Sequence, residues 1–206
     1  MRRRGFLAVL GLALSGRAAG GAQKGDAQDE DALWRRLRGG GHILLIRHAA
    51  TDPGIGDPPG FRLGQCRTQR NLSERGRREA GALGAALRDG GVAVGRVWSS
   101  RWCRCLDTAR LAFGRAEPAP MLDSMFDDDA GLRRARVAQT LARLAAVREP
   151  ANLALVTHDV NIRALADESV APGGIVVARM DGGALAVLGQ LRLGFATHLD
   201  PGERSG

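Results

Sequence analysis

The chain has 206 residues, of which 44% are hydrophobic and 25% are charged; these values exclude a fibrous or largely disordered protein and fit one globular domain. The formal net charge is +8, but Arg2, Arg3, Arg4 and Arg17 supply four of these charges, which leaves +4 for the rest. Aromatic residues make up only 4% and tyrosine is absent, so we expect no nucleic-acid partner.

The first 22 residues have the pattern of an export signal. Arg2 to Arg4 form a basic start, Phe6 to Leu14 an apolar segment, and Ala18 to Ala22 a small-residue stretch suited to cleavage. The residues Arg3-Arg4-Gly5-Phe6-Leu7 resemble a bacterial twin-arginine signal, and an ordinary secretory signal is the alternative. Both predict a periplasmic or secreted protein with no stable membrane insertion once the signal is removed.

Residues 23–32 are polar and we expect them to be a linker, followed by one domain over residues 33–206. The apolar run at residues 42–47 is typical of a strand buried on both faces. The segment 51–69 is rich in proline and glycine and predicts a long loop, which usually serves function in a compact domain.

Further along the chain, apolar periodicity and turn residues predict alternating helices and strands. Ser73 is expected to cap a helix that ends at residues 89–91, and the helix at 132–147 is expected to turn Leu132, Ala138, Leu141 and Leu144 inward. The remaining expected strands are 96–98, 118–122, 152–156, 175–180 and 184–190, and the remaining helices are 104–113 and 161–166. This order predicts an α/β fold of three layers, a doubly wound, mainly parallel sheet with helices on both faces.

Three cysteines are present, Cys66, Cys103 and Cys105. Export exposes them to oxidising conditions, so we expect one disulfide and one free thiol, in a pairing that the sequence leaves open. No second cysteine pair accompanies Cys103 and Cys105, so a structural metal is not expected.

Polar residues with catalytic chemistry follow three of the predicted strands. Arg47-His48 follows the first strand, Ser99 to Arg104 the second, and Thr157-His158-Asp159 the strand at 152–156. Ligands bind beyond the carboxyl ends of strands in such sheets, so we expect these residues to converge. A neutral imidazole can accept a phosphoryl group when arginines neutralise the phosphate, as Arg47 and Arg104 can, with His158 donating to its oxygens.

At these residues the sequence resembles the histidine phosphatase superfamily, also called phosphoglycerate mutase-like. The similar elements are Leu45-Ile46-Arg47-His48-Ala49, in which Ala49 stands where the family has glycine, Asn71-Leu72-Ser73, Ser99 to Arg104 with Thr108-Ala109, and Val156-Thr157-His158. The resemblance implies a phosphomonoester phosphatase that forms a phosphohistidine on His48, binds phosphate through Arg47, Arg104 and His158, and needs no cofactor or metal.

The sequence offers two candidates for the proton donor. A glutamate that one branch of the family has after the third strand is absent, and the stretch contains Asp127, Asp128 and Asp129 instead. The acid phosphatase branch has an aspartate directly after the second histidine, which makes Asp159 the leading candidate and the 127–129 run the alternative. That run can equally be a solvated loop that caps the next helix.

The substrate is expected to be a small phosphate ester, selected by the 51–69 loop with Arg62 and Arg70 in or beside it. The sequence does not name the ester or the oligomeric state. The alternatives are a non-catalytic phosphate-ester binding module of the same fold, a phosphoglycerate mutase and a metal-dependent hydrolase.

Overall fold

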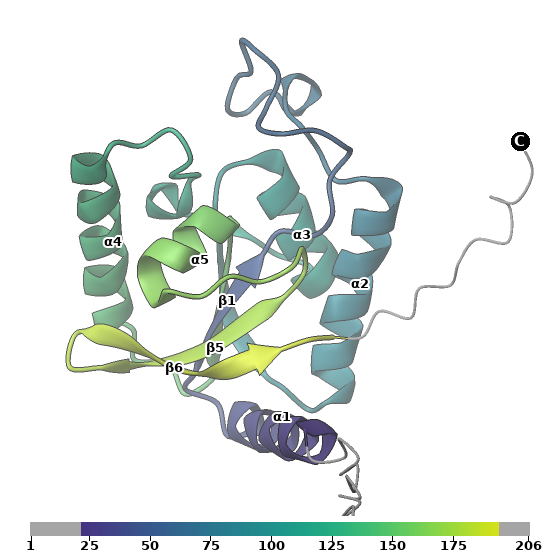
Figure 1. The fold of residues 1–206 in the computed structure, drawn as a ribbon, viewed down its shortest axis with the longest axis vertical. Helices are drawn as coiled ribbons and strands as arrows, with labels where there is room; N and C mark the ends of the chain where they lie inside the picture. Colours follow the sequence, from purple (N-terminus) through teal and green to yellow (C-terminus); the bar gives the residue numbers. More distant parts are fainter. Residues whose placement is uncertain (1–21, 194–206) are drawn as a thin grey trace, which may run out of the picture.

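The computed structural model describes residues 22–193, which form one six-stranded sheet covered by helices (Figure 1). The strands are β1 (Ile43–Arg47), β2 (Val94–Ser99), β3 (Glu117–Pro118), β4 (Asn152–Thr157), β5 (Ile175–Asp181) and β6 (Ala184–Leu191). The helices are α1 (Ala22–Arg38), α2 (Glu74–Asp89), α3 (Cys103–Phe113), α4 (Ala130–Ala145) and α5 (Asp159–Ala166), with short 3₁₀ turns η1 (Cys66–Thr68) and η2 (Pro120–Leu122).

The strand order is β3-β2-β4-β1-β5-β6. The four strands from β3 to β1 run parallel to their neighbours, whereas β5 and β6 are antiparallel, joined by a turn at Gly182 and Gly183. The predicted α/β fold with a mainly parallel sheet is therefore confirmed. The central pair, β1 and β4, directs its carboxyl ends to the same edge.

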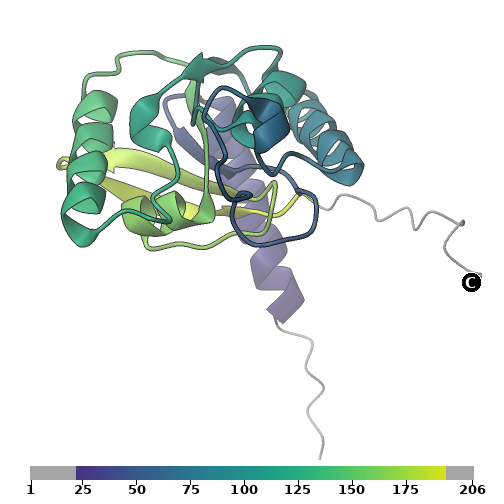
Figure 2. The same cartoon turned by 90° about the horizontal axis from the view of Figure 1, so that it is seen from above.

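Helices cover both faces of the sheet, as Figure 2 shows from above. Along β1 the side chains alternate between the faces. Leu44 and Ile46 join a buried cluster with residues of α1, α2 and α3, whereas Ile43 and Leu45 join a second cluster with residues of α4 and α5. Two cores on opposite sides of one sheet thus hold β1 rigidly, and β1 delivers Arg47 and His48 to the edge.

Local signals place the helix starts. The side chain of Ser73 accepts a hydrogen bond from the backbone N–H of Gly76 and caps α2, as predicted. Asp129 caps α4 in the same way, accepting from the N–H of Leu132. Helix α3 ends at Gly114, whose left-handed conformation (φ 70°) is easily adopted by glycine.

Three expectations about individual segments are corrected. Residues 23–32 are part of helix α1 rather than a linker, because their alanine, glutamine and acidic residues tolerate a helix despite Gly25. Residues 118–122 divide between the two-residue strand β3 and the turn η2, since Pro118 and Pro120 do not allow a regular strand. Leu132 is 46% exposed and Ala138 is exposed too, so neither points inward as predicted; the buried residues of α4 are Thr140 and Leu144.

The predicted signal over residues 1–22 lies outside the described residues, apart from Ala22 at the start of α1. Within residues 22–193, none of the helices combines the length and the apolar character that a membrane crossing requires.

Candidate active site

The carboxyl ends of β1 and β4 place two histidines next to each other. Arg47 and Thr157 are register partners in the parallel pair, and the backbone N–H of His48 donates to the carbonyl of Thr157 at 2.9 Å. His48 and His158 therefore leave the sheet at the same level. Their ring centroids lie 5.4 Å apart, and the ring planes are inclined at 71°. The predicted convergence of the two strand ends is thus present in the fold.

His48 is buried and electrically neutral. Its Nδ1 lies 2.9 Å from the carbonyl oxygen of Ala49, which can only accept, so Nδ1 carries the proton and Nε2 keeps the lone pair. Burial lowers the pKa of His48 to about 3, and the charges of Arg104 and Arg47 act in the same direction. A neutral ring with a free Nε2 has the form that a nucleophile needs.

His158 is also buried and neutral, and burial holds its pKa well below its usual range. It occupies the position before the first residue of α5. The hydroxyl of Ser100, at the end of β2, lies 3.0 Å from its Nε2. A hydroxyl that donates to Nε2 leaves the ring proton on Nδ1.

Three arginines surround this pair of rings. Arg47 comes from the end of β1, Arg104 from the first turn of α3, and Arg70 from the end of the loop after β1. Their positive charges lower the pKa of both histidines. In all three, the guanidinium Nε is buried without a hydrogen-bond partner among the described residues. Buried donors of this kind are costly unless a ligand pairs with them, and an anion such as phosphate would do so.

The loop that carries His48 is held by neighbouring elements. The hydroxyl of Thr108 in α3 accepts from the N–H of Ala49, and the carboxylate of Glu79 in α2 accepts from the N–H of Ala50. Helix α2 approaches this loop so closely that a Cβ at Gly76 would lie 1.8 Å from the carbonyl oxygen of Ala50. Ala49 is not among the residues with positive φ, so alanine fits at this position without backbone strain.

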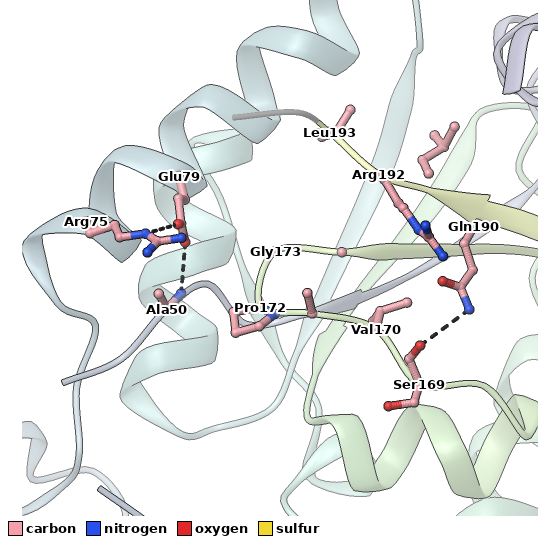
Figure 3. Close-up of a pocket in the computed structure, with 13 residues that line it drawn as sticks. Ala50, Arg75, Glu79, Ser169, Val170, Pro172, Gly173, Gln190, Arg192 and Leu193 are labelled. Carbon is pink, nitrogen blue, oxygen red and sulfur yellow. Dashed lines mark hydrogen bonds and ion pairs between the residues drawn. The ribbon is translucent and has the colours of Figure 1, made fainter. Parts of the chain in front are cut away.

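A cavity of about 660 Å³ borders the same loop (Figure 3). Ala50, Glu79 and the segment 169–174 line it, and the figure shows Glu79 directed toward Ala50. None of the two histidines and three arginines lines this cavity. We therefore place the chemistry at the histidine pair. Among residues 22–193, no group of three or more histidines, cysteines or acidic residues is arranged to hold a metal ion.

Comparison with known proteins gives one family match and many similar structures. The model of the histidine phosphatase superfamily (branch 1) matches residues 43–131, which include Arg47, His48, Arg70 and Arg104. No curated protein sequence matches the chain.

Three of the similar structures illustrate the shared fold. The product of the open reading frame Rv3214 from Mycobacterium tuberculosis has a TM-score of 0.54 at 16% identity, and covers 71% of this chain and 94% of its own. YhfR from Bacillus stearothermophilus has a TM-score of 0.54 at 17% identity, with the same coverages of 71% and 94%. Phosphoserine phosphatase from Entamoeba histolytica, in complex with 3-phosphoglyceric acid, has a TM-score of 0.53 at 14% identity, and covers 74% and 97%.

The chain has the histidine phosphatase fold. The expected resemblance to this superfamily is thereby confirmed. The matched segment contains the predicted nucleophile His48 and the three arginines that surround it in the site. His158 lies beyond this segment and joins them through the pairing of β4 with β1.

Asp159, the first residue of α5, lies beside this candidate site, and several partners hold its side chain. Its carboxylate accepts from Ser169 Oγ at 2.9 Å and from the N–H of Val170 at 3.1 Å, and its Oδ1 lies 3.9 Å from Arg47 Nη1. Burial acts to raise the pKa of Asp159, but these hydrogen bonds and charges outweigh it and lower the pKa. Its function as proton donor stays a prediction.

The alternative aspartates are engaged in the loop before α4. Asp129 caps that helix, Asp128 forms an ion pair with Arg136 at 3.1 Å, and Asp127 is exposed. The reading of this run as a loop that caps the next helix therefore describes Asp129 correctly.

The structure separates the two arginines predicted in the loop. Arg70 belongs to the cluster around His48. Arg62 is exposed, and only its backbone forms hydrogen bonds within the described residues, with Thr68, Gln65 and Gln69. The loop also carries Cys66, which forms a disulfide with Cys103 and leaves Cys105 as the buried free thiol.

Two residues of the site were not identified from the sequence. Ser100 lies in a segment already singled out, but nothing indicated its contact with His158. Asp57 forms an ion pair with Arg104 at 2.8 Å. The sequence signal that could have indicated this ion pair is an aspartate in the 51–69 loop, which also contains arginines.

Proposed function

We propose that the protein is an exported phosphomonoester phosphatase that acts through a covalent phosphohistidine on His48. The observation that carries this proposal is the neutral His48, with Nε2 free, beside His158 and within a cluster of three arginines.

In the first step, Nε2 of His48 attacks phosphorus while the bond between phosphorus and the ester oxygen breaks. The leaving oxygen takes a proton and departs as an alcohol. In the second step, water attacks phosphorus, the bond between phosphorus and Nε2 breaks, and inorganic phosphate leaves. Deprotonation of the water returns the proton donor to its starting state.

The phosphate oxygens bind to donors that the protein leaves unpaired. Arg47, Arg70 and Arg104 each contribute a buried Nε, and guanidinium groups match phosphate in forked hydrogen bonds. The Nδ1 proton of His158, favoured by the contact of its Nε2 with Ser100, adds a further donor. These groups stabilise the charge that spreads over the oxygens in the transition state.

Asp159 is the proposed proton donor. Its Oδ1 lies 3.9 Å from Nη1 of Arg47, and Asp159 directly follows His158 in the sequence; both facts place the carboxylate close to the proposed phosphate site. A phosphate dianion bound at Arg47 would add negative charge near the carboxylate and favour its protonated form. The alternative donors are Asp127, which is exposed, Asp128, which pairs with Arg136 of α4, and Asp129, which caps α4.

The export proposal rests on the sequence of residues 1–22, and the disulfide between Cys66 and Cys103 is consistent with it. We propose a small phosphate ester as substrate, with Arg62 at the loop as an outer contact. The Entamoeba protein with this fold, 14% identical to this chain, is named a phosphoserine phosphatase.

The test compares phosphate release from a set of phosphomonoesters by the wild type, His48→Ala and a matched histidine control. His42→Ala is the control, because His42 precedes β1 and lies at the opposite end of the strand from His48. We expect turnover in the wild type and control, none in His48→Ala, and no loss with EDTA. Full activity of His48→Ala would contradict the nucleophile assignment, and activity that requires a divalent metal would contradict the proposed chemistry.

A further inference from the structure

We propose that Asp57 is a positioning residue that orients Arg104 for phosphate binding, an inference that rests on the phosphatase function proposed above. Asp57 lies in the loop after β1, which rises beyond the carboxyl ends of the central strands (Figure 1).

The carboxylate of Asp57 receives three hydrogen bonds from three different parts of the site. Oδ1 accepts from Arg104 Nη1 at 2.8 Å and from the backbone N–H of Arg70 at 2.9 Å. Oδ2 accepts from Trp102 Nε1 at 2.9 Å. Both side chains of the ion pair are buried, with 7% exposure for Asp57 and 5% for Arg104. A buried pair with this many hydrogen bonds has a defined geometry, unlike an exposed one.

This contact determines which edge of the Arg104 guanidinium remains for a ligand. Nη1 is used by Asp57, with the carbonyl of Arg70 at 3.4 Å, whereas Nε is buried without a partner among the described residues. The edge formed by Nε and Nη2 is one of the forks that bind phosphate through two parallel hydrogen bonds. By engaging Nη1, Asp57 fixes the rotation of the guanidinium and leaves this fork for the phosphate.

The loop that carries Asp57 is itself held in place, so Asp57 has a fixed position relative to Arg104. The same loop is joined to the start of α3 by the Cys66–Cys103 disulfide and by Gln69, whose side-chain oxygen accepts from the N–H of Cys103. Arg104 is the next residue of that helix. Asp57 and Arg104 are therefore attached to one rigid unit, although 47 positions separate them in the sequence.

Asp57 also balances charge in the free enzyme. Burial and the charge of Arg104 lower the pKa of Arg70, and Asp57 opposes this effect. Burial acts to raise the pKa of Asp57 itself, but the hydrogen bonds from Arg104, Arg70 and Trp102 lower it, so it stays ionised. Loss of this carboxylate would leave the arginines repelling one another around an empty site.

The test measures the dissociation constant of inorganic phosphate by calorimetry, together with kcat and KM for a phosphomonoester. We expect Asp57→Ala to weaken phosphate binding and to lower kcat/KM by about tenfold to a hundredfold, because a misplaced donor loses most of its value. Asp57→Asn keeps an acceptor oxygen for Arg104 and should lie between Asp57→Ala and the wild type. The matched control is Asp52→Asn, an exposed aspartate of the same loop, which should behave as the wild type.

A double-mutant cycle separates positioning from general folding. In an Arg104→Ala background, Asp57→Ala should change phosphate affinity by less than about twofold, because the group that it orients is gone. If the full effect persists in that background, Asp57 acts through the loop as a whole and the proposal is wrong.

Two other results would also overturn it. Phosphate binding that is tighter in Asp57→Ala than in the wild type would mean that Asp57 competes with phosphate for Arg104. Equal affinities in the wild type and both Asp57 variants would mean that it has no influence. Phosphate affinity does not depend on the covalent step, so the absence of a phosphoenzyme in the wild type would contradict the proposed mechanism and not this inference.

Discussion

Nδ1 of His48 lies 2.9 Å from the carbonyl oxygen of Ala49, the next residue in the chain. Because the carbonyl can only accept, the ring keeps its proton on Nδ1, and because burial lowers the pKa of His48 to about 3, the ring stays neutral. We expect the ¹⁵N NMR signals of His48 to show this tautomer unchanged between about pH 5 and pH 8. A titration near the ordinary value of about 6.5 would contradict the assignment.

The same burial makes stability depend on pH. Each histidine binds a proton near pH 6.5 when unfolded and at a lower pH when folded, so the unfolded state takes up more protons as the pH falls. The free energy of unfolding should therefore fall below about pH 6.5, by about 1.4 kcal/mol per pH unit for each histidine. Urea unfolding at pH 7 and pH 5 measures this, and His48→Gln should show a smaller loss than the wild type. An equal loss in both would contradict the prediction.

Ser100→Ala tests the orientation of His158. Without the hydroxyl 3.0 Å from Nε2, the remaining partner of Nε2 is the Sγ of Cys105 at 3.5 Å, and a thiol is the weaker hydrogen-bond donor. We expect kcat to fall by about tenfold to a hundredfold, with a smaller change in KM, since the donor matters most in the transition state. The buried Ser99, whose hydroxyl bonds to the carbonyl of Ser100, provides the control variant Ser99→Ala. Equal effects on kcat from both variants would indicate a packing effect only.

The disulfide should matter for both stability and substrate binding. The double variant Cys66→Ser with Cys103→Ser frees a loop closed over a sequence separation of 37, which we expect to cost about 2–4 kcal/mol of unfolding free energy. KM should rise, because the loop carries Arg70 and Asp57. Reductant should reproduce both changes in the wild type and leave the double variant unaltered. A reduced wild type with unchanged KM would contradict the link between the disulfide and the site.

Leaving-group chemistry tests the proton donor. A general acid contributes most when the departing alkoxide is strongly basic, typically about a hundredfold to ten-thousandfold, and little when a stable phenolate departs. Asp159→Asn should therefore slow the hydrolysis of alkyl phosphates far more than that of p-nitrophenyl phosphate. Asp127→Asn and Asp128→Asn should retain the wild-type ratio of the two rates. A collapse of this ratio in either of these variants, with a normal ratio in Asp159→Asn, would move the donor to the loop before α4.

The sequence predicted those features that arise from local patterns. The apolar runs at residues 42–47 and 152–156 predicted two buried strands, and the residues that follow them meet because parallel strands end at a common edge. The Ser73 cap and the end of α2 were predicted from single residues. Local patterns failed where two states compete, as in residues 23–32, which are helical although their polar composition also suits a linker.

Other features depend on contacts that no local pattern records. The pairing of Cys66 with Cys103 requires the loop after β1 to lie against the start of α3. The ion pair of Asp57 with Arg104 has the same origin. Leu132 has the right spacing for an inward position, but it is exposed because α4 turns Thr140 and Leu144 toward the sheet.

The most direct test of the whole account is to trap the phosphoenzyme. Brief incubation of the wild type with a ³²P-labelled phosphomonoester and a mild quench should give protein-bound phosphate that is labile to acid and stable to base, and peptide mapping should place it on His48. His48→Ala should carry no label. Label on a residue other than His48, or turnover by a wild type that never becomes labelled, would contradict the central claim.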